Sequence, residues 1–203
     1  CDLDAVRTVR SRGVFMEHAA PEGIGAMSAV LGLDATVIED VLNGREGVSI
    51  ANYNCPGQIV ITGEAKAVAE AGTALKEAGA RRVLPLKVSG PFHSPMMRPA
   101  GEELAKVFAG VSMNPLKVPY VANINAEVIT DCGKIEELLV AQVSGSVRWQ
   151  QSVETMIREG VDTFVEIGPG KTLTGFLRKI DKNVKSYHIG SWKEAVSVCE
   201  ELK

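Results

Sequence analysis

The sequence predicts an α/β protein in which a compact ferredoxin-like unit, residues 24–89, interrupts a larger layered domain formed by residues 1–23 and 90–203. The 203 residues, 45% of them hydrophobic, are enough for one large core or two small ones. Residues 25–88 follow the order strand, helix, strand, strand, helix, strand, which is the ferredoxin-like pattern. Beyond this unit, short apolar strands alternate with helices, which is typical of α/β layers with parallel strands.

The first predicted element is an amphipathic helix over residues 4–19, with Asp2 or Asp4 as its N-cap. Arg12 lies at the edge of its buried face, where a guanidinium must pair with an anion or carry an unpaired charge, which is costly. A structural salt bridge or a side chain that extends to water would also satisfy this arginine. Because the helix starts almost at the first residue, we expect the chain to be a fragment. The apolar stripe of the helix consists of Val6, Val9, Gly13, Met16 and Ala20.

The elements of the ferredoxin-like unit are predicted from turn residues and periodicity. They are a strand at 26–31, a helix between the cap Asp34 and Gly44, a hairpin of 48–54 and 58–62 around Cys55-Pro56-Gly57, a helix at 64–78 and a strand at 82–88. An RNA-binding domain of this topology would carry aromatic residues on its central strands to stack bases. These strands offer only Tyr53, so we expect no nucleic-acid partner.

A loop rich in glycine and proline follows the last strand of this unit. Its sequence is Ser89-Gly90-Pro91-Phe92-His93-Ser94-Pro95, and a helix with apolar residues at helical spacing comes after it. Open α/β sheets carry their reactive groups on loops at the carboxyl ends of strands. His93 is therefore the first candidate for chemistry, although a histidine at this place can also simply cap the loop.

Three short buried strands and four helices are predicted in the rest of the chain. The strands are 118–122, 163–167 and 184–189, and the helices lie near 133–143, 147–159, 171–180 and 191–202. Gly168-Pro169-Gly170-Lys171-Thr172 has the form of the end of a phosphate-binding loop. That motif requires a glycine five positions before Gly170, and Val165 stands there. A tight strand-to-helix turn is the better interpretation.

Composition excludes several classes of protein. The net charge of −3 gives no basic surface for nucleic acid. The four cysteines, Cys1, Cys55, Cys132 and Cys199, are scattered without a Cys-x-x-Cys pair, so we predict no zinc site and no disulfide framework, and a reducing cytoplasm fits best. No apolar run is long enough to span a bilayer, and the N-terminus carries no signal-peptide pattern. We expect no metal, no cofactor and no membrane partner.

Five segments together resemble the bacterial malonyl-CoA:acyl-carrier-protein transacylase family, the acyltransferases of type II fatty-acid synthesis. They run in order along the whole chain, which makes the resemblance far more specific than any one motif. It implies a partial α/β-hydrolase-like parallel sheet domain interrupted by a ferredoxin-like subdomain. The segments are Val9-Arg10-Ser11-Arg12-Gly13-Val14-Phe15-Met16, Gly25-Ala26-Met27-Ser28-Ala29-Val30, Asn52-Tyr53-Asn54-Cys55-Pro56-Gly57-Gln58, Gly90-Pro91-Phe92-His93-Ser94 and Val165-Glu166-Ile167-Gly168-Pro169-Gly170-Lys171.

The resemblance assigns roles to particular residues. It implies that His93 is the base that activates a serine nucleophile and that Arg12 holds the malonyl carboxylate. A backbone carbonyl orients the histidine in this family, and the matching segment here gives Gln142. Asn54 matches a polar position near the active site, and an asparagine that forms the hairpin turn is the alternative.

Two partners follow from the resemblance, malonyl-CoA and an acidic acyl carrier protein. Arg81 and Arg82 form a basic pair shortly before His93 that could attract such a carrier. An ordinary pair of solvated charges is the alternative.

One part of the family pattern is absent from this sequence. The nucleophile of the family lies in a Gly-His-Ser-x-Gly turn upstream of the arginine, and no Gly-x-Ser-x-Gly occurs here. Ser94 is no substitute, because neighbours on an extended loop point in different directions. We therefore expect the chain alone to be inactive, with its own N-terminal segment as a further partner. The alternatives are a truncated, non-catalytic module that binds malonyl groups and carrier protein, and an unrelated ferredoxin-like regulatory domain.

Overall fold

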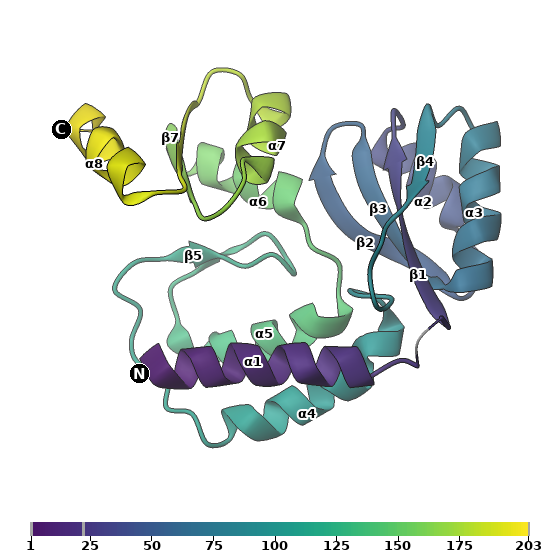
Figure 1. Cartoon of the computed structure of the whole chain (residues 1–203), viewed down its shortest axis with the longest axis horizontal. Coiled ribbons are helices and arrows are strands. Elements are labelled where there is room, and N and C mark those ends of the chain that lie inside the picture. Colours follow the sequence, from purple (N-terminus) through teal and green to yellow (C-terminus); the bar gives the residue numbers. More distant parts are fainter. Residues whose placement is uncertain (1, 22, 203) are drawn as a thin grey trace.

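The computed structural model of the chain describes residues 2–21 and 23–202, and it has three parts that are visible in Figure 1. A four-stranded sheet with two helices lies at the right of the view. Three long helices, α1, α4 and α5, lie side by side at the bottom. The C-terminal strands and helices lie at the upper left, so the fold is mixed α/β, as the sequence predicted.

The four-stranded sheet has the strand order β2-β3-β1-β4 and is antiparallel throughout. This is the order of the ferredoxin-like arrangement, so that prediction is confirmed, whereas the domain boundaries at residues 24 and 89 stay a prediction. The last strand ends at Pro85 and is shorter than expected, although the N–H of Leu86 still donates to the carbonyl of Met27 at 2.9 Å. The strands are β1 (Gly25–Leu31), β2 (Val48–Cys55), β3 (Gln58–Glu64) and β4 (Arg82–Pro85).

Two helices, α2 (Ala35–Leu42) and α3 (Ala65–Glu77), cover one face of this sheet and enclose its core. Asp34 occupies the N-cap position of α2 as predicted, but its side chain makes no capping hydrogen bond. Apolar residues recur every three or four positions on α3, so one side of the helix is buried. Its core residues are Val68, Ala71 and Leu75, which pack with Val30, Ile38 and Ile61.

Leu75→Ala is expected to lower the free energy of unfolding by about 2–5 kcal/mol, because it removes a fully buried side chain and leaves a cavity. Urea titration followed by circular dichroism measures this. Leu84→Ala is the matched control, since Leu84 is 44% exposed, and it is expected to cost much less. Equal losses for the two variants would contradict the assignment of the core to the helix-covered face.

The opposite face of the sheet is covered by the segment that carries His93. Phe92 packs against Met27, Ala51 and Val60 on this face. The same ring also packs against the cluster that contains Met97. The residue before His93 is thus held between the small sheet and the helical layer.

The helical layer is built from α1 (Asp2–His18), η1 (Pro95–Met97), α4 (Arg98–Phe108), η2 (Cys132–Lys134) and α5 (Ile135–Ser144). Its core contains Met16, Ala20 and Met97, with Leu104, Phe108 and Val143 from the other helices. The predicted stripe on α1 is only half correct, because Val6 and Val9 are 66% and 69% exposed. Val9 lines an open groove between the N-terminal half of α1 and the chain that follows α4.

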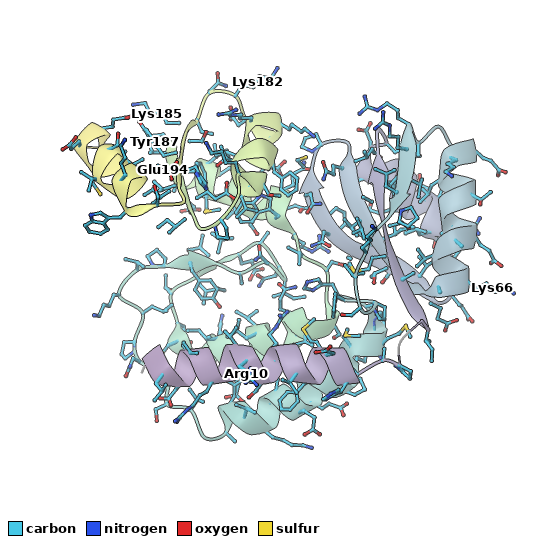
Figure 2. The ribbon with its side chains drawn as sticks, viewed as in Figure 1. Arg10, Lys66, Lys182, Lys185, Tyr187 and Glu194 are labelled. Atoms are coloured by element: carbon cyan, nitrogen blue, oxygen red, sulfur yellow. The ribbon has the colours of Figure 1, made fainter. Side chains whose placement is uncertain are left out.

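Charged residues outside these contacts extend into solvent. Arg10, labelled on α1 in Figure 2, is exposed. Lys66 reaches out from α3 in the same view, where it lies 3.8 Å from Glu70 one helical turn along. Such exposed pairs contribute little to stability.

The C-terminal part combines two small sheets with three helices. Strand β7 (Thr163–Ile167) pairs in parallel with β8 (Lys185–Ile189), as predicted. The predicted strand 118–122 was wrong in length and direction: β5 (Tyr120–Val121) pairs antiparallel with β6 (Val128–Ile129). The chain reverses at Ala126, which has φ +59°. The helices are α6 (Trp149–Arg158), α7 (Thr172–Ile180) and α8 (Trp192–Glu201).

The remaining expectations concern the N-cap of the first helix, the cysteines, membrane-spanning helices and metal sites. Cys1 and the side chain of Asp2 lie outside the described residues, and Asp4 lies inside the first turn of α1 and not at its cap. The described cysteines, Cys55, Cys132 and Cys199, are free thiols. In the part of the chain that the structure describes, no helix combines the length and apolar character needed to cross a membrane. No cluster of three or more metal-ligating side chains is found in residues 2–21 and 23–202.

Candidate active site

His93 lies on a tightly held loop between β4 and η1. Its backbone has φ +60°, a left-handed conformation that is uncommon for residues other than glycine and recurs at functional sites. The hydroxyl of Ser94 donates to the carbonyl of Pro91 at 2.6 Å and accepts from the N–H of Met96 at 3.3 Å. Ser94 is 1% exposed, so its hydroxyl is engaged in capping η1, in agreement with its exclusion as the nucleophile.

The imidazole of His93 is oriented by two backbone carbonyls. Its Nδ1 lies 3.1 Å from the carbonyl oxygen of Gln142 and 3.1 Å from that of Gly145. A carbonyl oxygen only accepts hydrogen bonds, so Nδ1 must carry the proton. The neutral ring then keeps its lone pair on Nε2, which is the arrangement of a general base.

The surroundings of His93 lower its pKa. Burial of the ring is the largest cause, and the positive charge of Arg12 acts in the same direction. The hydrogen bonds to Gln142 and Gly145 oppose them and raise the pKa, but the net direction is downward from the ordinary value of 6.5. The ring is therefore neutral, and able to accept a proton, at neutral pH.

Arg12 lies on α1 as a half-buried cation. Burial lowers its pKa, which shows that the charge is partly removed from water. The ion pairs found in the described part of the chain do not include it, so the expected alternative of a structural salt bridge is not present there. Since its charge also acts on His93, the two side chains share one electrostatic environment. The positive charge of Arg12, which has no counter-ion among the described residues, thus acts on the base.

His93 is expected to titrate below 6.5, because burial and Arg12 both disfavour its protonated form. Nuclear magnetic resonance of the imidazole signals against pH measures this. The unfolded chain then binds a proton more readily than the folded chain, so this histidine costs folding stability as the pH falls below 6.5. A titration above 6.5 would contradict the buried position of the ring.

Asn54 and the basic pair lie on opposite edges of the small sheet. Asn54 is half-buried on β2, next to Tyr53, and β2 is the strand that contacts Val147. Arg81 and Arg82 are exposed at the start of β4. The sheet order separates β4 from β2 by three strand spacings, or about 14 Å. Asn54 thus lies on the strand that pairs with Val147, two residues after Gly145, whereas the arginine pair lies at the other edge of the sheet. The roles of Asn54 in substrate binding and of the arginine pair in carrier docking stay predictions.

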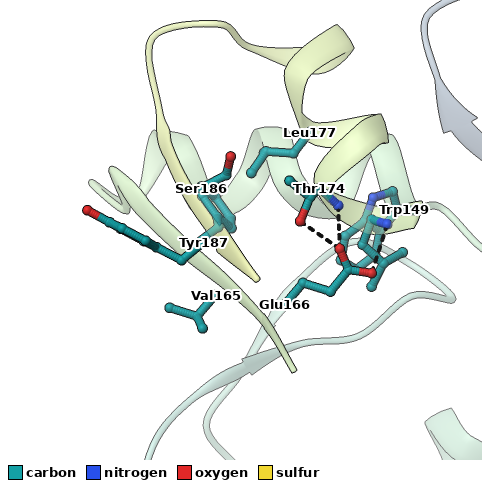
Figure 3. Close-up of a pocket in the computed structure, with 9 residues that line it drawn as sticks. Trp149, Val165, Glu166, Thr174, Leu177, Ser186 and Tyr187 are labelled. Atoms are coloured by element: carbon teal, nitrogen blue, oxygen red, sulfur yellow. Dashed lines mark hydrogen bonds between the residues drawn. The ribbon is translucent and has the colours of Figure 1, made fainter. Parts of the chain in front are cut away.

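The loop Gly168-Pro169-Gly170-Lys171-Thr172 has no free helix N-terminus to offer a phosphate. The carboxylate of Glu166 accepts hydrogen bonds from the N–H of Leu173 at 3.1 Å, and from the N–H and hydroxyl of Thr174 at 2.8 and 2.6 Å (Figure 3). These are the amide groups that a bound phosphate would use. The adjacent cavity of about 80 Å³ is mostly apolar and does not include His93 or Arg12.

Sequence reasoning missed Gly145 as the second acceptor for His93. A Cβ on Gly145 would lie 2.1 Å from Cδ1 of Ile124 and 3.0 Å from the carbonyl of Ala141, so no larger residue fits without movement. The only signal in the sequence was a glycine two residues after the predicted helix 133–143, which normally indicates no more than a helix end.

Known proteins are similar to this chain over nearly its whole length. Residues 1–200 match the family model described as "Acyl transferase domain". The malonyl CoA-acyl carrier protein transacylase of Bacillus subtilis (strain 168) is 48% identical over 204 residues, which cover 98% of this chain and 64% of that protein. The crystal structure of the transacylase of the same name from Clostridium perfringens has a TM-score of 0.93 at 41% identity and covers 98% of this chain and 64% of that one.

A second solved structure contains a partner protein. It is a complex of a type II PKS acyl-carrier protein with its malonyl-transacylase, which has a TM-score of 0.90 at 38% identity and covers 97% of this chain and 65% of that one. The chain thus spans a little less than two thirds of the length of the relatives that it matches. Since the family model covers nearly every residue, this chain belongs to the acyl transferase domain family.

Proposed function

We propose that this chain is the histidine- and arginine-bearing part of a transferase that moves a malonyl group from malonyl-CoA to the phosphopantetheine thiol of an acyl carrier protein. The names of its relatives, which include malonyl CoA-acyl carrier protein transacylases, support the reaction. The observation that carries the proposal is a neutral imidazole, held through Nδ1, on which a half-buried guanidinium acts that has no counter-ion among the described residues.

The proposed mechanism is a two-step exchange through a serine ester, and the serine belongs to a segment that precedes this chain. Nε2 of His93 takes the proton of the serine hydroxyl as the oxygen attacks the thioester carbonyl. The carbon–sulfur bond then breaks, and the CoA sulfur leaves with the proton returned by His93. In the second step His93 takes the proton of the carrier thiol as its sulfur attacks the carbonyl of the malonyl ester. The ester carbon–oxygen bond then breaks, and the serine oxygen leaves with the proton returned by His93.

The fixed tautomer of His93 matters in both steps. A ring that carried its proton on Nε2 would have no lone pair to offer the serine. The carbonyls of Gln142 and Gly145 prevent this, because they accept only from Nδ1–H. Unlike an aspartate, they add no negative charge, so the pKa of His93 stays low and its protonated form returns the proton readily.

The proposed substrate has a carboxylate at the end of its acyl group, and Arg12 fits it chemically. A guanidinium can donate two parallel hydrogen bonds to a carboxylate. An acetyl group would leave the half-buried charge of Arg12 unpaired, which favours malonyl over acetyl. Asn54, on the strand next to the loop that holds His93, is the further polar residue proposed to contact the substrate.

The test is to complete the enzyme. The N-terminal segment of the Bacillus subtilis relative that precedes the matched region is fused to this chain or added as a separate polypeptide. Transfer of labelled malonyl from malonyl-CoA to holo acyl carrier protein is then measured. We expect transfer by the completed protein and none by the chain alone, with an added segment whose serine is replaced by alanine as the control.

The other outcomes separate the alternatives. Carrier binding without transfer in the completed protein would favour the truncated binding module, and neither binding nor transfer would favour the unrelated regulatory domain. Variants of Arg81 and Arg82 test the carrier-docking prediction in the same assay. A cytoplasmic location, predicted from the scattered cysteines, stays a prediction.

A further inference from the structure

The Gly145 carbonyl is the less obvious of the two acceptors that hold His93, and its own position needs an explanation. It belongs to a loop residue just after α5, where the backbone is extended, with φ −98° and ψ 157°. A loop carbonyl that is free to rotate would not hold a ring in one tautomer. Some other group must therefore fix its direction.

The side chain of Gln142 supplies that restraint. Its Nε2 lies 3.0 Å from the carbonyl oxygen of Gly145 and 3.3 Å from that of Ser146, and it donates to both. Oε1 of the same amide has no hydrogen-bond partner among the described residues. If the amide were turned over, Oε1 would face two acceptors, so the two carbonyls decide its orientation. One residue thus contributes a backbone carbonyl to His93 and an amide that holds the second carbonyl.

The hydroxyl of Ser146 fixes the loop from the other side. It donates to the carbonyl of Ile50 on β2 at 2.6 Å. The next residue continues the attachment to β2. The N–H of Val147 donates to the carbonyl of Ala51 at 2.7 Å, and the carbonyl of Val147 accepts from the N–H of Tyr53 at 2.8 Å. Residues 146 and 147 therefore extend the small sheet beyond β2, and the loop that holds His93 is attached to that sheet.

We propose that the amide of Gln142 and the hydroxyl of Ser146 are positioning groups for His93, which keep the Gly145 carbonyl directed at Nδ1 and so hold the ring in the Nδ1–H tautomer. Neither side chain touches a reacting atom in this scheme. The small sheet contributes only indirectly: its strand β2 holds Ser146, and Ser146 holds the loop that carries the Gly145 carbonyl. The catalytic importance of this restraint rests on the proposed function, since the tautomer matters only if His93 is the base.

The tautomer itself can be measured on this chain without any assay of transfer. Nitrogen-15 spectra distinguish Nδ1–H from Nε2–H in a neutral imidazole, and the chain has three histidines, His18, His93 and His188, to assign. We expect His93 to be Nδ1–H in the unchanged chain. In Gln142→Met, which keeps the side-chain length and removes the donor, the ratio of Nδ1–H to Nε2–H is expected to fall roughly threefold or more, comparable to the loss of one weak hydrogen bond.

Matched controls separate positioning from general loosening of the fold. Gln150→Met makes the same change on α6, where the amide donates to Glu154 and not to the loop, and it is expected to leave the ratio unchanged. Ser146→Ala is expected to lower the ratio, whereas Ser144→Ala, two residues away in the chain, is not. His188, whose Nε2 lies 2.9 Å from the Gly168 carbonyl, reports in the same spectra whether each variant is folded.

The result that overturns the proposal is an unchanged His93 ratio in folded Gln142→Met. If that variant does not fold, Ser146→Ala decides, and an unchanged ratio there overturns the role of the small sheet. The proposed function fails differently: the completed enzyme would show no malonyl transfer although the tautomer of His93 responds to both substitutions.

Discussion

His93→Ala in the completed enzyme is expected to lower kcat/KM for malonyl transfer by roughly 10²- to 10⁴-fold, the range over which a positioned general base acts. The reason is that the serine hydroxyl keeps its proton at neutral pH unless a base takes it. Two carbonyl acceptors hold the ring of His93, and its backbone is left-handed. Steady-state transfer from malonyl-CoA to carrier protein measures the effect.

Two controls make the result specific to the base. His18→Ala removes an exposed histidine from the same helix that carries Arg12 and is expected to leave the rate within about twofold, as for most exposed positions. Added imidazole is expected to restore part of the rate of His93→Ala, because the side-chain deletion leaves space for a free base. A variant that keeps most of its rate would contradict the assignment of His93 as the base.

The elements that could be predicted are those determined by local signals. The hairpin of β2 and β3 follows from the turn Cys55-Pro56-Gly57, in which Gly57 has φ +70°. Strand β7 was predicted with its observed bounds, since a short run of β-branched and apolar residues ends at Gly168. The ferredoxin-like order followed once these elements were in place, because few topologies satisfy short connections.

Features that depend on distant contacts could not be predicted in this way. Periodicity identified the apolar side of α1 but not which half of that side the neighbouring helices cover, so the exposure of Val6 and Val9 was missed. The direction of β5 is set by a turn at Ala126, a residue without turn propensity. In the candidate site, the same limit applies to Gly145, because its role is carried by a carbonyl that every residue has.

Arg12 is the residue proposed to make the enzyme select malonyl over acetyl groups. Helical position alone placed it at the edge of a buried face and left a salt bridge as an alternative. The structure adds that burial lowers its pKa and that its charge acts on His93. A cation that stays partly buried without a counter-ion costs stability. Such a cost is typical of groups kept for binding an anion.

Arg12→Ala in the completed enzyme is expected to lower kcat/KM for malonyl-CoA by roughly 10²- to 10³-fold, since removal of one partner of a desolvated charge pair costs about 2–5 kcal/mol. Transfer from acetyl-CoA is expected to stay the same or to rise, because the acetyl group no longer leaves a buried charge unpaired. Arg12→Lys is expected to recover only part of the malonyl rate, because an ammonium cannot donate the paired hydrogen bonds of a guanidinium.

Arg10→Ala serves as the matched control for these variants, because Arg10 lies on the same helix but is exposed. The loss of positive charge is the same, so any general effect on the attraction of the anionic substrate appears in both variants and can be subtracted. The ratio of malonyl to acetyl transfer is therefore the informative quantity. Equal losses for the two substrates in Arg12→Ala would mean that Arg12 supports the fold or the imidazole, and recognition of the carboxylate would have to come from another residue.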